Sequence, residues 1–331
     1  MPVSVIIPVR NERDNIMGVI NSVKGALKNS QLNFEIVIVD DNSTDGTYEI
    51  LKGLEDIKLI RITEKPQTAV GKNFALWKGF KVSKGDVLLF LDADVKLEQS
   101  SLERILPFLR DYDLVSVSPR QETGSPFEAS LQPFVFKFLS SIYPLERIKD
   151  PKSSVAAANG QFILIKRGVY EKVCGHKAVI SQILEDVEFA RNVKLSGFRI
   201  LLLNGKDYGV RCRMYKGFKD LINGWSKNLF LLSYKKLYLP LTFGFMHLFE
   251  ALAIVFLTVY FAFVGEYGLA SGVFLLGNLY TFYAFRNHYQ FYTVIHLLVG
   301  SLLFIFVSLR SYYWIKFKGA VYWKGRWVKI H

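Results

Sequence analysis

The sequence predicts an α/β domain on a mostly parallel sheet, followed by interfacial amphipathic helices and a C-terminal α-helical transmembrane region. Over the first 120 residues, short β-branched runs alternate with helical patterns, which is typical of βαβ units with helices on both faces of a sheet. The last third instead contains three apolar stretches, each close to the length that crosses a bilayer.

The predicted elements of the first domain follow in a regular order. Strands are expected at residues 3–9, 35–40, 58–63, 86–91 and 114–118, and helices at 12–29, 44–54, 70–82 and 99–110. A second mixed segment adds strands at 161–167 and 199–203 and a helix at 186–195. The carboxyl ends of parallel strands form the edge at which open α/β sheets place their ligands.

Two further segments predict amphipathic helices. Residues 126–145 repeat Phe and other apolar side chains at helical spacing, which fits either a core helix or a helix in the membrane interface. Residues 218–232 place Trp225 on an apolar face, with Lys, Asp and Asn on the opposite face, just before a long apolar tract. This second pattern favours a helix that lies in the membrane interface.

The three apolar stretches lie near residues 241–264, 268–285 and 291–309. Runs of this length with so little charge are rare in soluble helical bundles, so we expect an integral membrane protein. The expected division of the chain is a first domain at 1–215, an interfacial helix and linker at 216–240, about three spans in 241–310 and a basic tail at 311–331.

The net charge of +13 is unevenly distributed. Residues 213–331 contain 13 Lys/Arg and 3 Asp/Glu, so most of the excess flanks apolar segments. This pattern indicates attraction to anionic lipid head groups and not a nucleic-acid partner, which would need a basic soluble groove. Three spans would place the basic tail opposite the first domain, against the positive-inside rule. Either one stretch does not cross the membrane or the rule fails, and the sequence leaves both open.

Cysteine content and the N-terminal pattern indicate the compartment. Cys174 and Cys212 are too few for a disulfide framework or a zinc cluster. The chain starts with a strand pattern and not with a basic, then apolar, leader. We therefore expect a multi-pass protein of the cell membrane whose first domain lies in the cytoplasm.

Charged side chains follow three of the predicted strands. The first strand is followed by Arg10-Asn11-Glu12, the second ends in Asp40-Asp41 and the fourth is followed by Asp92-Ala93-Asp94. Acidic clusters repel one another unless a cation or hydrogen-bond donors neutralise them. Two carboxylates spaced by one residue can share a hard divalent cation, which then bridges diphosphate oxygens. Each cluster alone could equally be an ordinary turn, and Asp40 could cap the next helix.

Two other motifs could serve displacement chemistry. Lys72, in the first turn of a predicted helix, is a candidate to stabilise negative charge on a leaving diphosphate, or is simply solvated. Glu185 and Asp186 open another predicted helix, where a carboxylate could act as general base or merely complement the helix dipole.

Taken together, these motifs resemble family-2 glycosyltransferases of the GT-A fold, a Rossmann-like, mostly parallel sheet. The resemblance rests on Val5–Glu12, Ile38–Thr47 and Leu91–Asp94, and covers residues 1 to about 230. It implies inverting transfer from a UDP- or GDP-linked nucleotide-sugar, assisted by Mg²⁺ or Mn²⁺. The resemblance further implies that Asp94 and Asp92 hold the metal, and that Asp186 is the base with Glu185 supporting it. The residues expected to bind the nucleotide-sugar are Pro8, Arg10, Glu12, Asp40, Asp41, Lys72, Asp92 and Ala93.

Finer matches resemble the hopanoid-associated, carotenoid and ceramide glycosyltransferase branch, which are membrane enzymes that act on lipid hydroxyls. The matching segments are Ala158–Gln161, Cys174–His176, Arg213–Tyr215, Gly224–Asn228 and Trp323–Arg326. The chain departs from this branch at Ala69-Val70, where Gly-Trp is common, and it lacks a clean Gln-x-x-Arg-Trp motif. His176 could also be a structural residue in a turn. The residues expected on the acceptor side are Asn159, Gly160, His176, Arg213, Trp225 and Lys227.

The predicted function is metal-dependent inverting transfer of a sugar to a membrane lipid, through a hydroxyl, at the cytoplasmic face. The alternative is a polyprenyl-phosphate sugar synthase of the dolichyl-phosphate mannose or glucose synthase type, whose anionic acceptor needs no general base. Glu185, Asp186 and Lys72 favour the hydroxyl acceptor. A non-catalytic membrane scaffold on the same fold is a distant alternative, which the intact Asp92, Asp94 and Asp186 disfavour.

Overall fold

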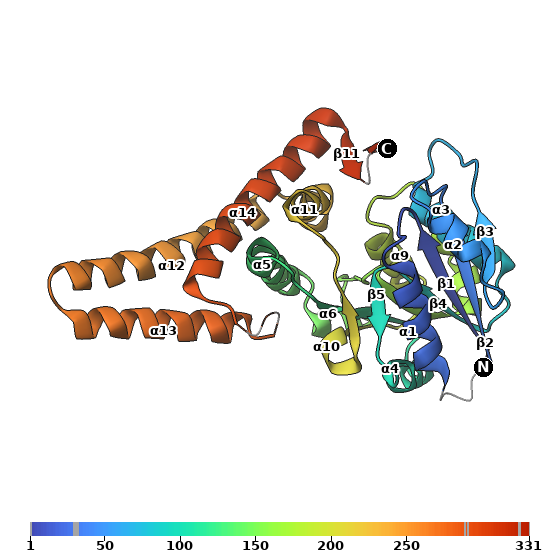
Figure 1. The fold of residues 1–331 in the computed structure, drawn as a ribbon, viewed down its shortest axis with the longest axis horizontal. Helices are drawn as coiled ribbons and strands as arrows, with labels where there is room; N and C mark the ends of the chain where they lie inside the picture. Colours follow the sequence, from blue (N-terminus) through green and yellow to red (C-terminus); the bar gives the residue numbers. More distant parts are fainter. Residues whose placement is uncertain (1, 29–32, 288, 290, 324–325, 331) are drawn as a thin grey trace. The chain divides into compact units, whose positions relative to one another are not determined.

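A computed structural model describes residues 2–28, 33–287, 289, 291–323 and 326–330 of the chain. These residues form two compact units (Figure 1). The first unit contains Met1–Glu122 and Tyr143–Met214, and the second contains Thr123–Ile142 and Tyr215–Ile330. The segment expected as an amphipathic helix near 126–145 therefore packs with the C-terminal helices, whereas the expected first domain, 1–215, had included it.

The first unit is built on a seven-stranded sheet in the order β3-β2-β1-β4-β8-β6-β9. Its strands are β1 (Val3–Val9), β2 (Phe34–Asp40), β3 (Lys58–Arg61), β4 (Val87–Leu91), β6 (Leu114–Ser118), β8 (Phe162–Lys166) and β9 (Ile200–Asn204). Only β8 runs antiparallel to its neighbours β4 and β6, so the predicted mostly parallel sheet is confirmed. β4 is apolar along its whole length, and β1 is apolar except for Ser4, because both faces of these strands are covered.

Short helices and a second small sheet complete the first unit. The three-stranded sheet has the order β5-β10-β7, formed by Val95–Leu97, Val210–Cys212 and Arg120–Gln121. The helices are α1 (Ile16–Lys28), α2 (Thr47–Lys52), α3 (Gly71–Val82), α4 (Ser101–Ile105), a 3-10 helix η1 (Leu106–Arg110), α6 (Leu145–Lys149), α7 (Arg167–Lys172), α8 (Gly175–Ala178), α9 (Glu185–Leu195) and α10 (Gly205–Tyr208). Helix α3 lies tight on β1, because a Cβ at Gly79 would come 2.5 Å from Ile6 Cγ2.

The second unit is helical. It contains α5 (Pro126–Ile142), α11 (Phe218–Leu232), α12 (Tyr238–Phe263), α13 (Tyr267–Phe285), α14 (Val294–Tyr313), a π-helical turn η2 (Trp314–Lys318) and a hairpin of β11 (Ala320–Trp323) and β12 (Arg326–Lys329). Three of its helical segments are long and apolar enough to cross a membrane: α12, α13 and the segment Val294–Lys318. Helix α5 packs through Phe134 and Phe138 against Phe304 of α14, so its Phe-rich face is buried in this unit.

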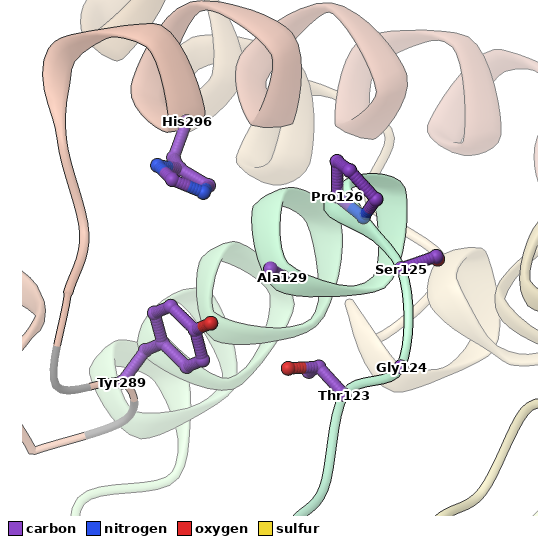
Figure 2. A pocket seen from close by; sticks show the side chains of 7 residues that line it. All are labelled: Thr123, Gly124, Ser125, Pro126, Ala129, Tyr289 and His296. Carbon is purple, nitrogen blue, oxygen red and sulfur yellow. The ribbon is translucent and has the colours of Figure 1, made fainter.

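A pocket of about 340 Å³ opens in the second unit, where the chain enters α5 (Figure 2). It lies between the start of α5 and the start of α14. The residues that line it are Thr123, Gly124, Ser125, Pro126, Ala129, Tyr289 and His296.

Candidate active site

Lys72 joins three segments of the first unit at the carboxyl end of β4. Its Nζ atom lies 2.8 Å from Asp92 Oδ1 and 3.1 Å from Glu185 Oε1. The same ammonium group donates a hydrogen bond of 3.3 Å to the Gly160 carbonyl oxygen. The Lys72 ammonium group, at the start of α3, therefore contacts the turn after β4, the loop before β8 and the start of α9. It is not simply a solvated surface lysine.

Asp186 lies in the same cluster and is held by backbone groups. Its Oδ2 atom accepts from the Gly160 N–H at 2.8 Å and its Oδ1 atom from the Val187 N–H at 2.9 Å. Burial and the neighbouring charge of Glu185 raise the pKa of Asp186 to about 6, although Lys72 and these two donors oppose the rise. At neutral pH Asp186 is therefore an ionised carboxylate that is more basic than an ordinary Asp.

The charge of Lys72 is fixed by its partners. Burial alone would lower the pKa of Lys72, but the carboxylates of Asp92, Glu185 and Asp186 raise it far above its usual range. Lys72 is therefore cationic at every physiological pH. Its charge offsets the mutual repulsion of the Asp92, Glu185 and Asp186 carboxylates. Such neutralisation was expected from the sequence for the acidic cluster that contains Asp92.

The end of β2 is neutralised in the same way by two arginines. Arg10 Nη1 donates to the Asp41 carbonyl oxygen at 2.7 Å and lies 3.3 Å from Asp41 Oδ2. Asp40 is fully buried, accepts from the Ser43 N–H, and has Arg61 Nε at 3.6 Å from its Oδ2 atom. Asp40 thus closes the turn at Ser43 and does not cap the following helix.

Pro8 and Glu12 frame this end of the sheet. Pro8 pairs in register with Val39 of β2, which brings the ends of the first two strands together. The backbone N–H of Glu12 donates to Thr47 Oγ1 at 2.9 Å, and its Oε2 atom accepts from the Asn15 amide at 2.7 Å. The structure therefore brings the expected nucleotide-side residues of β1 and β2 together at the edge where β4 also ends.

The Asp92-Ala93-Asp94 segment follows β4 directly. Ala93 is buried, and the Asp92 backbone N–H donates to the Gln161 carbonyl oxygen at 3.0 Å. Asp94 lies beside Cys212, where burial and then the Asp94 carboxylate raise the pKa of that thiol. Among the residues the structure describes, no group of three or more His, Cys, Asp or Glu side chains is arranged to hold a metal ion. Two carboxylates nevertheless fit Mg²⁺ or Mn²⁺, because such ions are commonly held by one or two carboxylates together with substrate phosphates.

Five of the six expected acceptor-side residues divide into three groups. Asn159 and Gly160 lie in the cluster, with Asn159 fixed by the Ser116 hydroxyl, which receives the Asn159 N–H at 2.8 Å. Arg213 is exposed near the end of the first unit. In the second unit, Trp225 is buried against Tyr215 and Phe136. Lys227 Nζ, also in the second unit, lies 4.5 Å from the centroid of the Trp323 ring.

His176 corrects one expectation. It is 1% exposed, its Nδ1 atom lies 3.0 Å from the Tyr170 hydroxyl, and its ring stacks on Phe189. Burial lowers its pKa to about 3, so the imidazole is neutral at physiological pH. A ring enclosed in this way has no face left for an acceptor hydroxyl, and His176 is a structural residue of the core.

Two residues that position the site were not found from the sequence. Arg61, at the end of β3, stands 3.6 Å from Asp40 and 4.1 Å from the centroid of the Tyr48 ring. Asn73 is buried, and its amide donates at 2.9 Å to the carbonyl oxygens of Val179 and Gln182, in the segment that leads to Glu185. The only signal for Asn73 is its place directly after Lys72 in the chain.

The comparison with known families follows this geometry. Residues 4–174 match the profile described as Glycosyl transferase family 2, which is more than half of the chain. The chain belongs to glycosyl transferase family 2. The matched segment includes Arg10, Asp40, Lys72, Asp92 and Asp94, but it ends before Glu185 and Asp186, whose place beside them comes from the structure.

Curated relatives of this family-2 chain carry lipid-related names. A 4,4'-diaponeurosporenoate glycosyltransferase from Staphylococcus haemolyticus is 28% identical over 69% of this chain and 60% of its own length. A dolichol-phosphate mannosyltransferase from Pyrococcus furiosus is 30% identical over 64% of this chain and 58% of its own length. The chain therefore spans less than two thirds of each of these two relatives.

A solved structure supports the fold. A mannosyltransferase from Pyrobaculum calidifontis, in complex with GDP-Man and Mn²⁺, aligns with 95% of this chain and 87% of its own at a TM-score of 0.58 and 17% identity. At this identity the likeness concerns the fold alone. It confirms the predicted GT-A architecture.

Proposed function

We propose that this chain transfers a sugar from a nucleotide-diphospho-sugar to a hydroxyl group of a membrane lipid, with inversion at the anomeric carbon. The observation that carries the proposal is the cluster of Lys72, Asp92, Glu185 and Asp186 at the carboxyl edge of the sheet. It combines a cation for a leaving diphosphate with a carboxylate whose pKa of about 6 suits a general base.

Asp186 would take the proton of the acceptor. The acceptor oxygen attacks the anomeric carbon as its O–H proton passes to the Asp186 carboxylate, and the bond between that carbon and the diphosphate oxygen breaks. The nucleoside diphosphate leaves with the electron pair of the broken bond. Attack from the side opposite the leaving group inverts the configuration. A base with a pKa near the working pH is largely deprotonated yet still strong enough to accept this proton.

Lys72 would act on the leaving group. In the structure it binds Asp92 and Glu185, and its ammonium group stands between the turn after β4 and the start of α9. This place suits a group that neutralises charge developing on the diphosphate. Asp92 and Asp94 would hold a divalent cation, Mg²⁺ or Mn²⁺, which supplies charge neutralisation at the diphosphate when bound. The Pyrobaculum calidifontis mannosyltransferase is in complex with Mn²⁺ as well as GDP-Man, which supports this expectation.

The donor would extend from this cluster along the edge of the sheet. Pro8, Arg10, Asp40 and Asp41 lie at the ends of β1 and β2, the strands next to β4, and would surround the nucleoside. Glu12 would close this region through its contact with Asn15. A UDP- or GDP-sugar is the expected donor, and GDP-Man in the Pyrobaculum calidifontis complex supports that class.

The acceptor is proposed to be a lipid because the chain carries three helical segments that could cross a membrane. The names of the Staphylococcus and Pyrococcus relatives point in the same direction. An anionic polyprenyl phosphate needs no general base and would meet the carboxylates of Glu185 and Asp186. The acidic pair therefore favours a hydroxyl acceptor over a phosphate. We place the first unit in the cytoplasm, where nucleotide-sugars are made available.

The test uses the full chain in lipid, a panel of UDP- and GDP-sugars with Mn²⁺ or Mg²⁺, and lipid extracts in which glycosylated products are read by mass spectrometry. We expect one donor class to be used and activity to be lost with EDTA. Asp186→Asn should lower turnover by roughly 10²- to 10⁴-fold while nucleotide binding persists. Glu188→Gln, on the same helix, is the matched control.

Three results would contradict the proposal. Turnover retained in Asp186→Asn removes the base from the mechanism. Transfer to a polyprenyl phosphate but to no lipid alcohol assigns the alternative acceptor. If no sugar is transferred from any donor and no nucleotide binds, the chain is not a glycosyltransferase.

A further inference from the structure

The three candidate spans of the second unit are covered by protein to different extents. In the most apolar window of α12 only 11% of the residues are buried, and in that of α13 only 22%. In the segment Val294–Lys318, which contains α14, the share is 44%. Much of the apolar surface of α14 is therefore already covered by protein and needs no lipid to bury it.

Helices α12 and α13 form a hairpin that is open to its surroundings. The two helices run side by side (Figure 1). Gly277 of α13 lies so close to α12 that an added Cβ would come 2.5 Å from Ile254 Cγ2. The Tyr280 hydroxyl of α13 donates to Glu250 Oε2 of α12 at 3.1 Å. Near the turn, Phe256, Phe263 and Tyr267 are 67%, 88% and 70% exposed.

The hairpin has the length of a bilayer crossing. Helix α13 has 19 residues. At a rise of about 1.5 Å per residue it is about 28 Å long, close to the ~30 Å hydrocarbon core of a bilayer. Its apolar, exposed surface and its length together fit a lipid environment.

Both ends of α14 lie at the end of this hairpin that is remote from its turn. At the start, the Val294 N–H donates to Asn278 Oδ1 at 3.3 Å, within the last turns of α13. At the other end, Arg310 Nη2 donates to Asn223 Oδ1 of α11 at 2.9 Å, and Ser311 Oγ accepts from the Phe230 N–H at 3.0 Å. Helix α11 leads within a few residues into α12. A third crossing would instead have to end beside the turn between α12 and α13.

Polar groups gather where the hairpin meets the rest of the unit. Glu250 Oε2 lies 2.7 Å from His247 Nδ1 and also accepts from Tyr280, while Lys137 of α5 donates to the Ala284 carbonyl oxygen at 2.8 Å. The pocket lined by Tyr289 and His296 lies at the start of α14, which follows the end of α13 in the chain (Figure 2). Ionisable groups are costly in hydrocarbon and gather at its boundary or in protein. Ala284 lies at the end of α13, so the contact with Lys137 marks the edge of the bilayer, whereas Glu250, His247 and Tyr280 lie deeper and pair with one another.

We propose that α12 and α13 form a single hairpin that crosses the bilayer, and that α14 lies at the bilayer surface on the side from which α11 enters. Residues 237–285 contain no Lys or Arg, so every basic residue of the C-terminal third then lies on that side, and the turn carries only Glu266. The basic hairpin of β11 and β12 returns to the side of the first unit. This removes the conflict with the positive-inside rule. The inference goes beyond the proposed reaction and holds whatever the donor and acceptor are.

The test is cysteine labelling with a membrane-impermeant maleimide on the full chain in sealed vesicles of one orientation. The native, exposed Cys174 reports the side of the first unit, because the described residues that precede α12 contain no candidate span. Three variants carry the probes: Glu266→Cys in the turn, and Lys329→Cys in β12 and Lys316→Cys for the C-terminal side. Each probe is combined with Cys174→Gly, which suits the positive φ of 56° at that position, and Cys212 is buried.

We expect Lys329→Cys and Lys316→Cys to label under the same conditions as Cys174, and Glu266→Cys to label only after the vesicles are opened. Labelling of each cysteine in detergent is the control for folding and reactivity. The proposal is overturned if the C-terminal probes and Cys174 label from opposite sides, because α14 would then be a third span. It is equally overturned if Glu266→Cys labels from the same side as Cys174.

Discussion

Gly160 offers a direct test of the site, because its backbone contacts both carboxylates of the pair on α9. A Cβ at this position would lie 3.1 Å from Asp186 Cβ, 3.2 Å from Asp186 Oδ2 and 3.2 Å from Glu185 Oε1. Its N–H also donates to Asp186 at 2.8 Å, and its carbonyl oxygen accepts from Lys72 at 3.3 Å. Gly160→Ala therefore presses on the proposed base without changing any charge.

The size of the effect follows from these distances. Non-bonded carbon contacts are most favourable at about 3.5–4.0 Å, so the two carboxylates must withdraw by about 0.3–0.5 Å. A misplacement of about 1 Å in an active site can cost on the order of 10²-fold in rate. On that scale Gly160→Ala should lower kcat roughly four- to tenfold. Donor affinity should change little, because the ends of β1 and β2 are untouched.

The assay compares kcat by product formation and donor affinity by calorimetry in the same preparation. Gly168→Ala is the control, since no atom lies within 4 Å of the added Cβ and alanine favours its helix α7. A wild-type kcat in Gly160→Ala would refute the placement of Asp186 and Glu185 at the reacting groups. So would a variant in which only donor affinity falls.

Three further predictions follow from the same geometry. Asp186 must be deprotonated to act as base, so kcat/KM should rise with pH through about 6 and level off above it. The profile is measured with the purified chain in lipid. If kcat/KM stayed constant down to pH about 4, a group other than Asp186 would be the general base. His176→Phe should leave kcat almost unchanged, because the new ring still fills the core. It should lower the unfolding free energy, measured by denaturant unfolding, by about 1 kcal/mol, because one hydrogen bond to Tyr170 is lost. A large loss of kcat at unchanged stability would instead support a role of His176 at the acceptor. Asn73→Leu should lower the unfolding free energy by about 2 kcal/mol and reduce kcat, because buried carbonyl groups of the segment before Glu185 lose their donor. If the unfolding free energy and kcat both stayed unchanged, the Asn73 amide would not hold this segment in place.

Local sequence patterns were sufficient to predict most strands of the sheet. Strands Val3–Val9 and Leu114–Ser118 and helix Phe218–Leu232 were predicted with the bounds they have in the structure. The strand-end motifs with Arg10, Asp41 and Asp92 were predicted to meet at one edge, and they do, because parallel strands bring their carboxyl ends together. The roles proposed for these residues in donor and metal binding stay predictions.

Other features depend on partners that are distant in the sequence. The antiparallel direction of β8, inserted between β4 and β6, leaves no trace in its own apolar pattern. The burial of His176 depends on Tyr170, Phe90 and Phe189 closing around it, and a histidine in a turn looks the same with or without them. The cation that Asp40 needs comes from Arg61 on the next strand, which no motif announces.

The membrane region separates most clearly what the sequence predicts from what tertiary packing adds. Length and composition make α12, α13 and α14 equivalent candidates, because hydropathy measures how a helix transfers from water to lipid by itself. Only the tertiary contacts separate them, since 44% of the most apolar window of the α14 segment is buried, against 11% for α12 and 22% for α13. The sequence by itself determined that the chain contains apolar helices and a family-2 sheet with its acidic edge. Which of those helices are covered by protein, and which residues neutralise that edge, were decided by packing, because burial and charge pairing belong to neighbours in space and not to neighbours in the chain.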